Sequence, residues 1–165
     1  MRSFRVGSSF GIPIKLDLTF LLVLPLFGWV IGSQVAQWAG ILNRSFGTQL
    51  DVAALTAGSV PWILGMTAAL GLFAGVVVHE LGHSLVAMRF GFPIESITLW
   101  ILGGIAELSE QPEDWRQELL IAIAGPVVSV LLGAAFFVVL RLTPWAPDPI
   151  VFLIGYLALV NVALA

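Results

Sequence analysis

The stretch VVVHELGH, residues 76–83, contains both histidines of the chain and a carboxylate between them. His79 and His83 are four positions apart, and residues with that spacing lie on one face of an α-helix. Two imidazoles one helical turn apart can bind the same metal ion. Glu80, directly after the first histidine, can then act as the general base that activates water. The stretch therefore predicts a metal site on a helix.

The setting of this stretch is apolar. Of the 165 residues, 59% are hydrophobic and 10% are charged, and the mean hydropathy is +1.02. Soluble domains are about half apolar and about a quarter charged, so the composition is typical of a membrane protein. Uncharged stretches of about 20 residues can cross a bilayer as helices. We therefore predict an α-helical multi-pass membrane protein with about four transmembrane helices, the last one incomplete, from the uncharged stretches 18–43, 52–78, 119–140 and 149–165.

Several classes of function are disfavoured by composition. The net charge of −3 does not indicate binding to nucleic acid. The chain has no cysteine, which excludes thiolate metal ligands and disulfides among these residues. No small-residue cleavage site precedes the first apolar run, so we expect that run to be a retained span rather than a signal peptide.

The local patterns predict a mixed order of elements. Residues 4–16 contain glycines, a proline and β-branched residues, and we expect them to be extended. A first helix is predicted from 19 to 32, followed by a polar outer loop over 33–59. A second helix should run from 61 to 90, where Gly91-Phe-Pro93 would end it.

The segment 94–108 is rich in β-branched and aromatic residues, and we expect a small membrane-associated strand hairpin there. Its central Gly103 and Gly104 fit two interpretations equally: a simple bend, or a place where a second extended chain approaches and pairs. Ser109, Pro112, Glu113 and Asp114 form a helix-start signature, which predicts a helix over 113–142.

Two further glycines, Gly71 and Gly75, continue the four-residue spacing of the histidines along the second helix. Small residues at this spacing are typical of helix packing in membranes. The same residues would also let another helix approach the metal-binding face, and the two interpretations are compatible.

The distribution of basic residues predicts the orientation of the chain. Basic residues of membrane proteins concentrate on the cytoplasmic side. Only Arg44 and Arg141 fall on one side of the predicted spans. The N-terminus, the histidines and the strand hairpin are therefore expected on the cytoplasmic side, together with the other basic residues: Arg2, Arg5, Lys15, Arg89 and Arg116.

Three ordered motifs resemble the site-2 protease family of intramembrane zinc metalloproteases. They are His79-Glu80-Leu81-Gly82-His83, then Gly103-Gly104-Ile105-Ala106, then Ala124-Gly125-Pro126. The first motif is moderately specific, and the ordered set is highly specific. The resemblance covers nearly the whole chain, and the extended start resembles a branch that often carries regulatory nucleotide-binding modules after its core.

The resemblance implies roles for individual residues. His79 and His83 would be Zn²⁺ ligands, and Glu80 would be the general base. The substrate would be a membrane-spanning segment of a single-pass protein or peptide, cleaved in the plasma membrane of a prokaryote. Such a segment would unwind and pair with the strand at Gly103 and Gly104. Ser129 falls where many members have asparagine, which leaves its role open.

One ligand expected from the resemblance is missing. The family's third ligand is an aspartate in an Asn-x-x-Pro-x-x-x-x-Asp-Gly motif, but Asn161 is followed three places on by Leu164 rather than proline. We therefore expect residues 1–165 to form the N-terminal portion of a single metalloprotease core, with the third ligand beyond Ala165. Two alternatives stay open: a glutamate within the chain as the ligand (Glu107, Glu110 or Glu118), or a non-catalytic membrane metal-binding protein or pseudoprotease.

Overall fold

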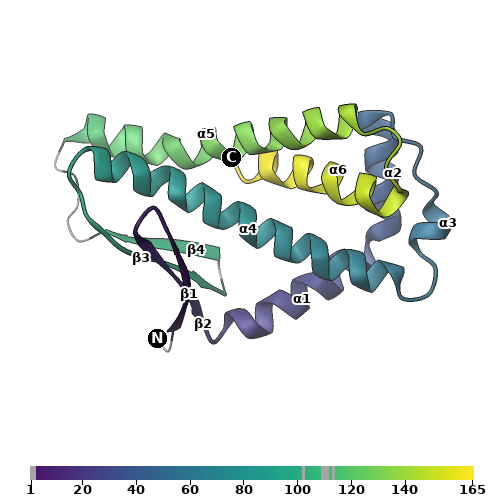
Figure 1. The fold of residues 1–165 in the computed structure, drawn as a ribbon, viewed down its shortest axis with the longest axis horizontal. Coiled ribbons are helices and arrows are strands. Elements are labelled where there is room, and N and C mark those ends of the chain that lie inside the picture. The colour runs from purple at the N-terminus through teal and green to yellow at the C-terminus, as the bar shows by residue number, and fades with distance from the viewer. Residues whose placement is uncertain (1–2, 102, 109–111, 113) are drawn as a thin grey trace. The chain divides into compact units, whose positions relative to one another are not determined.

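The computed structural model describes residues 3–101, 103–108, 112 and 114–165 (Figure 1). These residues form two compact units. The first is built from the chain up to Val23, Phe73–Val130 and the last two residues, and the second from Leu24–Leu72 and Leu131–Ala163. The elements in chain order are β1 (Ser3–Ser9), β2 (Ile12–Asp17), α1 (Phe20–Ser33), α2 (Val35–Phe46), α3 (Val52–Leu55), α4 (Val60–Arg89), β3 (Ile94–Trp100), β4 (Gly103–Leu108), α5 (Trp115–Leu142) and α6 (Asp148–Ala163).

The first unit contains a four-stranded sheet in the order β1-β2-β3-β4. The two extended segments expected from the sequence are confirmed, but they join one sheet, which the sequence did not predict. The join is the parallel pairing of β2 with β3, in which Ile14 faces Ile97. Ile12 and Ile97 are buried against Leu81 of α4, so the apolar face of the sheet packs on the helix that bears the histidines.

Asp17 makes the transition from β2 to α1. Its Oδ1 accepts hydrogen bonds from the Thr19 backbone N–H at 3.0 Å and from the Thr19 hydroxyl at 2.7 Å. These bonds hold the pKa of Asp17 below its usual value because they stabilise the carboxylate. This side-chain turn lies at the point where the chain leaves the sheet for α1.

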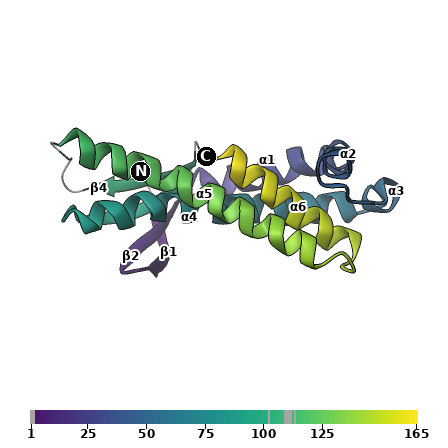
Figure 2. The same cartoon turned by 90° about the horizontal axis from the view of Figure 1, so that it is seen from above.

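Helix α4 ends where the sequence predicted. Gly91 adopts a left-handed φ of 87°, and the Phe92 N–H donates to the Ala87 carbonyl at 3.1 Å, as in a glycine-terminated helix. The second half of α4 lies beside the first half of α5 in both views (Figure 1; Figure 2). Helix α5 starts after Asp114, whose Oδ1 accepts from the Arg116 N–H. Ser109 and Glu113, expected in this start, lie outside the described residues.

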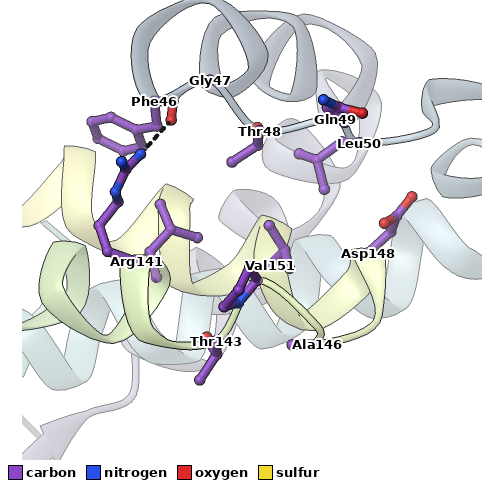
Figure 3. Close-up of a pocket in the computed structure, with 12 residues that line it drawn as sticks. Phe46, Gly47, Thr48, Gln49, Leu50, Arg141, Thr143, Ala146, Asp148 and Val151 are labelled. Carbon is purple, nitrogen blue, oxygen red and sulfur yellow. Dashed lines mark hydrogen bonds between the residues drawn. The ribbon is translucent and has the colours of Figure 1, made fainter.

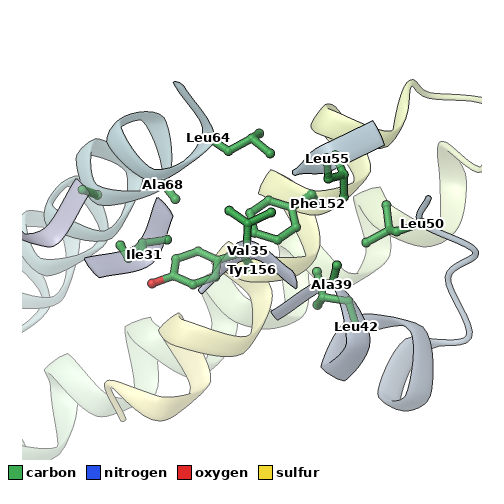
Figure 4. Packing of buried hydrophobic residues seen from close by; sticks show 11 residues of the cluster. Ile31, Val35, Ala39, Leu42, Leu50, Leu55, Leu64, Ala68, Phe152 and Tyr156 are labelled. Atoms are coloured by element: carbon green, nitrogen blue, oxygen red, sulfur yellow. The ribbon is translucent and has the colours of Figure 1, made fainter. Parts of the chain in front are cut away.

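The prediction of a polar outer loop over 33–59 is wrong for most of that range. Val35, Ala39 and Leu42 recur at helical spacing and are buried, so this segment forms helix α2, with its polar residues on the remaining surface. The scattered Gln, Asn and Ser residues concealed this stripe in the sequence. The stripe packs against Leu55, Phe152 and Tyr156 in the core of the second unit (Figure 4).

Glycines permit close helix contacts in the second unit. A Cβ at Gly65 of α4 would overlap the Gly28 carbonyl oxygen of α1, and a Cβ at Gly71 would lie 2.7 Å from a methyl of Leu157 in α6. Such contacts are the means by which membrane helices pack closely. The packing interpretation of Gly71 is therefore confirmed.

Two helices, α4 and α5, are long and apolar enough to cross a membrane. Helices α1 and α2 satisfy the same test together, but they are bent by 64°, so they form either a broken span or a re-entrant loop. Helix α6, with 16 residues, is a shorter apolar helix. The chain is thus a helical membrane protein with a small sheet, and its described residues contain two candidate spans, or three if the bent pair counts as one.

Candidate metal centre

His79 and His83 of α4 point their Nε2 atoms at each other. The two Nε2 atoms are 3.1 Å apart, and the ring centroids are separated by 4.8 Å. Two ligands bound to one tetrahedral Zn²⁺ at about 2.0–2.1 Å must have their nitrogen atoms slightly more than 3 Å apart. The side chains already have the separation that a shared metal ion requires.

The backbone of α5 sets the tautomer of His83. Its Nδ1 lies 2.7 Å from the carbonyl oxygen of Ile121. A carbonyl only accepts hydrogen bonds, so Nδ1 carries the proton, and Nε2 of the neutral ring presents a lone pair. This is the orientation of a metal-binding histidine with an outer partner.

Ser129, also on α5, holds the other ring. Its Oγ lies 2.8 Å from Nδ1 of His79, and the serine is only 1% exposed. A hydroxyl can accept the Nδ1 proton, and then both Nε2 lone pairs face the same point. Two facing lone pairs repel unless a cation lies between them. The sequence had left the role of Ser129 open, and its contact with His79 gives that residue a role.

Two glycines leave room around the rings. A Cβ at Gly125 would overlap Nε2 of His83 and lie 2.7 Å from Nε2 of His79. A Cβ at Gly82 would lie 2.9 Å from the carbonyl oxygen of Ala124, where α4 and α5 touch. The Ala-Gly-Pro motif therefore supplies the space into which both imidazoles point.

Glu80 lies beside the sheet. A Cβ at Gly104 of β4 would lie 2.7 Å from Cγ of Glu80 and 3.0 Å from Val76. Gly103 has a φ of 125° at the start of β4, with nothing near its Cβ position. The glycine pair thus has two separate roles: Gly103 supports the bend, and Gly104 admits the carboxylate side chain of α4.

No third ligand joins the histidines within the described chain, where no cluster of three or more His, Cys, Asp or Glu side chains is suited to a metal ion. The carboxylate of Glu107 accepts a hydrogen bond from Ser96 at 2.9 Å, and Glu118 is exposed on α5. Glu110 lies outside the described residues. Catalytic zinc sites usually have three protein ligands, so the residues present fit two of three coordination positions.

A polar cavity of about 470 Å³ occurs in the second unit and includes neither histidine (Figure 3). Arg141 at its edge donates to the Phe46 carbonyl at 3.4 Å, and Asp148 accepts from the Asp51 N–H at 2.8 Å. These bonds tie the turn between α5 and α6 to the loop after α2. The cavity therefore lies between these two hydrogen-bonded loops, and we assign it no part in the metal centre.

Comparison with known proteins matches residues 67–163 to the model of peptidase family M50. The chain belongs to this family. Among similar proteins, the Synechocystis protein sll0528, provisionally named a zinc metalloprotease, is 40% identical over 98% of this chain. The zinc metalloprotease MJ0392 of Methanocaldococcus jannaschii is 37% identical over 83%. The chain spans only 38% and 32% of these two relatives.

The solved structure of the site-2 protease from Methanocaldococcus jannaschii has a similar fold. The match covers 99% of this chain and 62% of that one, with a TM-score of 0.63 and 33% identity. The site-2 protease resemblance noted in the sequence is confirmed. The chain is therefore a member of a peptidase family, and the names of both relatives include zinc metalloprotease.

The contact between Ser129 and His79 gives a testable prediction. Ser129→Ala should weaken Zn²⁺ binding by about 10–100-fold, the usual effect of losing an outer partner of a metal-binding histidine. Ser129→Thr, which keeps the hydroxyl, should restore most of the affinity. The measurement is competition with a chromophoric chelator across a pH series.

Ser84 provides the matched control. It is also fully buried on α4, next to His83, but its hydroxyl has no hydrogen-bond partner among the described residues. Ser84→Ala should leave zinc affinity unchanged. If Ser129→Ala and Ser84→Ala lost the same zinc affinity, general packing, rather than the bond to His79, would maintain the site.

Proposed function

We propose that the chain is the N-terminal portion of an intramembrane zinc endopeptidase that cleaves membrane-spanning segments. The observation that supports this most strongly is the pair of Nε2 atoms 3.1 Å apart on a 30-residue apolar helix, with Glu80 between the two histidines. A polar cluster within a span is unfavourable unless it has a function. Membership of a peptidase family agrees with hydrolysis as that function.

The residues of this chain would have separate roles in hydrolysis. His79 and His83, oriented by Ser129 and the Ile121 carbonyl, would hold Zn²⁺. The bound metal would polarise the scissile carbonyl and make water more acidic. Glu80 would take a proton from the attacking water and deliver it to the leaving amine. Its position against Gly104 would keep the carboxylate beside the sheet.

The substrate would bind along β4. This strand is last in the sheet order and pairs with β3 alone among the described strands. A free edge can accept an extended peptide, whose backbone groups would bond to those of the strand. Because Glu80 packs against Gly104, a peptide added at Gly103 and Gly104 would be adjacent to the base. A transmembrane helix would have to unwind locally to bind in this way.

The third ligand would come from outside the described residues, since those contribute only two. The site would lie toward the cytoplasmic side of a prokaryotic plasma membrane, following the excess of basic residues near the N-terminus and the end of α4. The same two-ligand count also favours a second candidate, a membrane protein that binds a divalent ion without catalysis.

Metal removal tests the proposal. The intact protein, purified in detergent, should contain one zinc per chain, and dialysis against a chelator should abolish cleavage of a membrane-spanning reporter peptide. Adding back stoichiometric Zn²⁺ should restore it. Cleavage that persists after the zinc has been removed would contradict the proposal. Zinc-loaded protein that never cleaves any reporter would favour the non-catalytic alternative.

A further inference from the structure

The β1–β2 hairpin exposes apolar side chains that neither the core nor the proposed site uses. Phe4, Val6 and Phe10 are 42%, 53% and 70% exposed. The buried cluster that packs this sheet on α4 contains Ile12 of β2 and none of these three residues. The outer strand and the turn of the hairpin thus present an apolar surface without a partner in the described chain.

The turn of this hairpin is unusual in its chemistry. Phe10 and Gly11 both have positive φ, at 51° and 82°. Phe10 is the one non-glycine residue with positive φ in the part of the chain that the structure describes. Two-residue turns of this kind favour Asn-Gly, and a bulky aromatic residue is unfavourable at the first position. The ring of Phe10 is therefore not explained by the folding of the turn.

Two cations lie side by side on the same hairpin. Arg5 of β1 is directly opposite Lys15 of β2 in the strand register. Like charges in this position repel. Neither forms an ion pair with any carboxylate of the described chain. The carboxylates of Asp17, at the end of β2, and Glu107, on β4, are hydrogen-bonded to Thr19 and Ser96. The cation pair is therefore suited to an anionic partner outside the described structure.

We propose that the β1–β2 hairpin docks on the anionic phospholipid surface of the leaflet next to it, with Phe10 inserted at the headgroup–acyl boundary and Arg5 and Lys15 at lipid phosphates. An exposed aromatic residue and paired cations on one hairpin are the combination that binds such surfaces. The membrane is close along the chain, because β2 ends at Asp17 and the apolar helix α1 begins at Phe20. This surface has no part in the chemistry proposed for Glu80.

The absence of cysteine from this sequence allows a clean test. Ser8→Cys, at an exposed position of β1, is labelled with a fluorophore in the full chain, which is then placed in nanodiscs. One set of discs contains phosphatidylcholine alone, and the other contains phosphatidylcholine with phosphatidylglycerol. Quenching by lipids that carry a nitroxide reports contact of the hairpin with the membrane. We expect stronger quenching in the anionic discs, and less as salt is added.

Variants separate the two parts of the surface. Each cation near an anionic leaflet contributes roughly a fivefold factor, so Arg5→Gln with Lys15→Gln should lower docking by up to about 25-fold in anionic discs. Phe10→Asn creates the preferred Asn-Gly turn, so it should keep the hairpin folded while it reduces quenching in both lipids. Arg44→Gln, at an exposed position of α2 in the second unit, is the control and should change nothing.

Quenching that is equal in the two lipid compositions and unaffected by the glutamine pair would overturn the proposal. It would also be overturned by a label that stays exposed to water in both discs and becomes shielded only when an acidic protein segment is added. A Phe10→Asn variant that docks as well as the parent would remove the role assigned to the aromatic ring. Zinc content and cleavage do not enter these measurements.

Discussion

Replacing Glu80 by glutamine should lower the rate of peptide cleavage by roughly 10²–10⁴-fold, while the protein keeps its zinc. The two side chains have nearly the same shape, so the amide still fits beside Gly104, where a Cβ would already be 2.7 Å from Cγ of residue 80. Glutamine cannot take a proton from water. The expected result is thus a loss of rate without a loss of metal, measured by single-turnover cleavage together with metal analysis.

Glu118→Gln is the matched control for this substitution. Glu118 is an exposed carboxylate in the first turn of α5 and is not part of the histidine cluster. Its replacement should change neither zinc content nor cleavage rate. Cleavage at the parental rate by Glu80→Gln would rule out Glu80 as the general base, and loss of zinc from Glu118→Gln would identify that residue as the missing ligand.

The second large effect is expected at Gly125. Gly125→Ala should weaken zinc binding by more than the roughly 10–100-fold that the loss of an outer partner costs. The reason is steric: the new methyl group would overlap Nε2 of His83 and lie 2.7 Å from Nε2 of His79, so at least one ring must turn away. Chelator competition measures the affinity, and cleavage should be lost in proportion to the zinc.

Gly133→Ala tests whether this loss is specific. Gly133 also lies on α5, and its Cβ would also be crowded, at 2.7 Å from Val162 and 2.9 Å from the Ala158 carbonyl oxygen. Overpacking costs about 1–3 kcal/mol at either position, so both variants should melt earlier. Only Gly125→Ala should lose zinc affinity in the folded state. Parental zinc affinity in that variant would show that the rings do not need the space above Gly125.

The helices near the metal centre were predictable because their signals are local. The apolar run of α4 and the Gly91-Phe-Pro93 stop are contained in neighbouring residues, and the structure ends the helix at Arg89. Helix α2 was missed because its burial depends on contacts with residues more than 100 positions away, such as Phe152. Three apolar residues at helical spacing, with polar residues between them, do not predict a buried helix until the residue that they pack against is known.

The two metal-binding candidates and the base followed from spacing alone, since the i and i+4 positions of one helix fix their geometry. The groups that orient them did not. Ser129 and the Ile121 carbonyl act from α5, 50 and 38 positions from the histidines they hold. Every residue has a backbone carbonyl, so the sequence cannot indicate which carbonyl bonds a histidine. A serine in an apolar helix is common and does not by itself predict a contact with a metal-binding histidine. Gly104 was noticed, but its contact with Glu80 was not foreseen.

The parallel pairing of β2 with β3 has a consequence for biosynthesis. Ile14 leaves the ribosome 83 positions before Ile97, its partner in the sheet. At about 5–20 residues per second, the first two strands wait roughly 4–17 s for the third. A two-stranded hairpin is marginal alone, so it gains lasting support only after the intervening apolar segments have been synthesised. Because Glu80 packs against the last strand, the nascent protein would complete the surroundings of its base only after that delay.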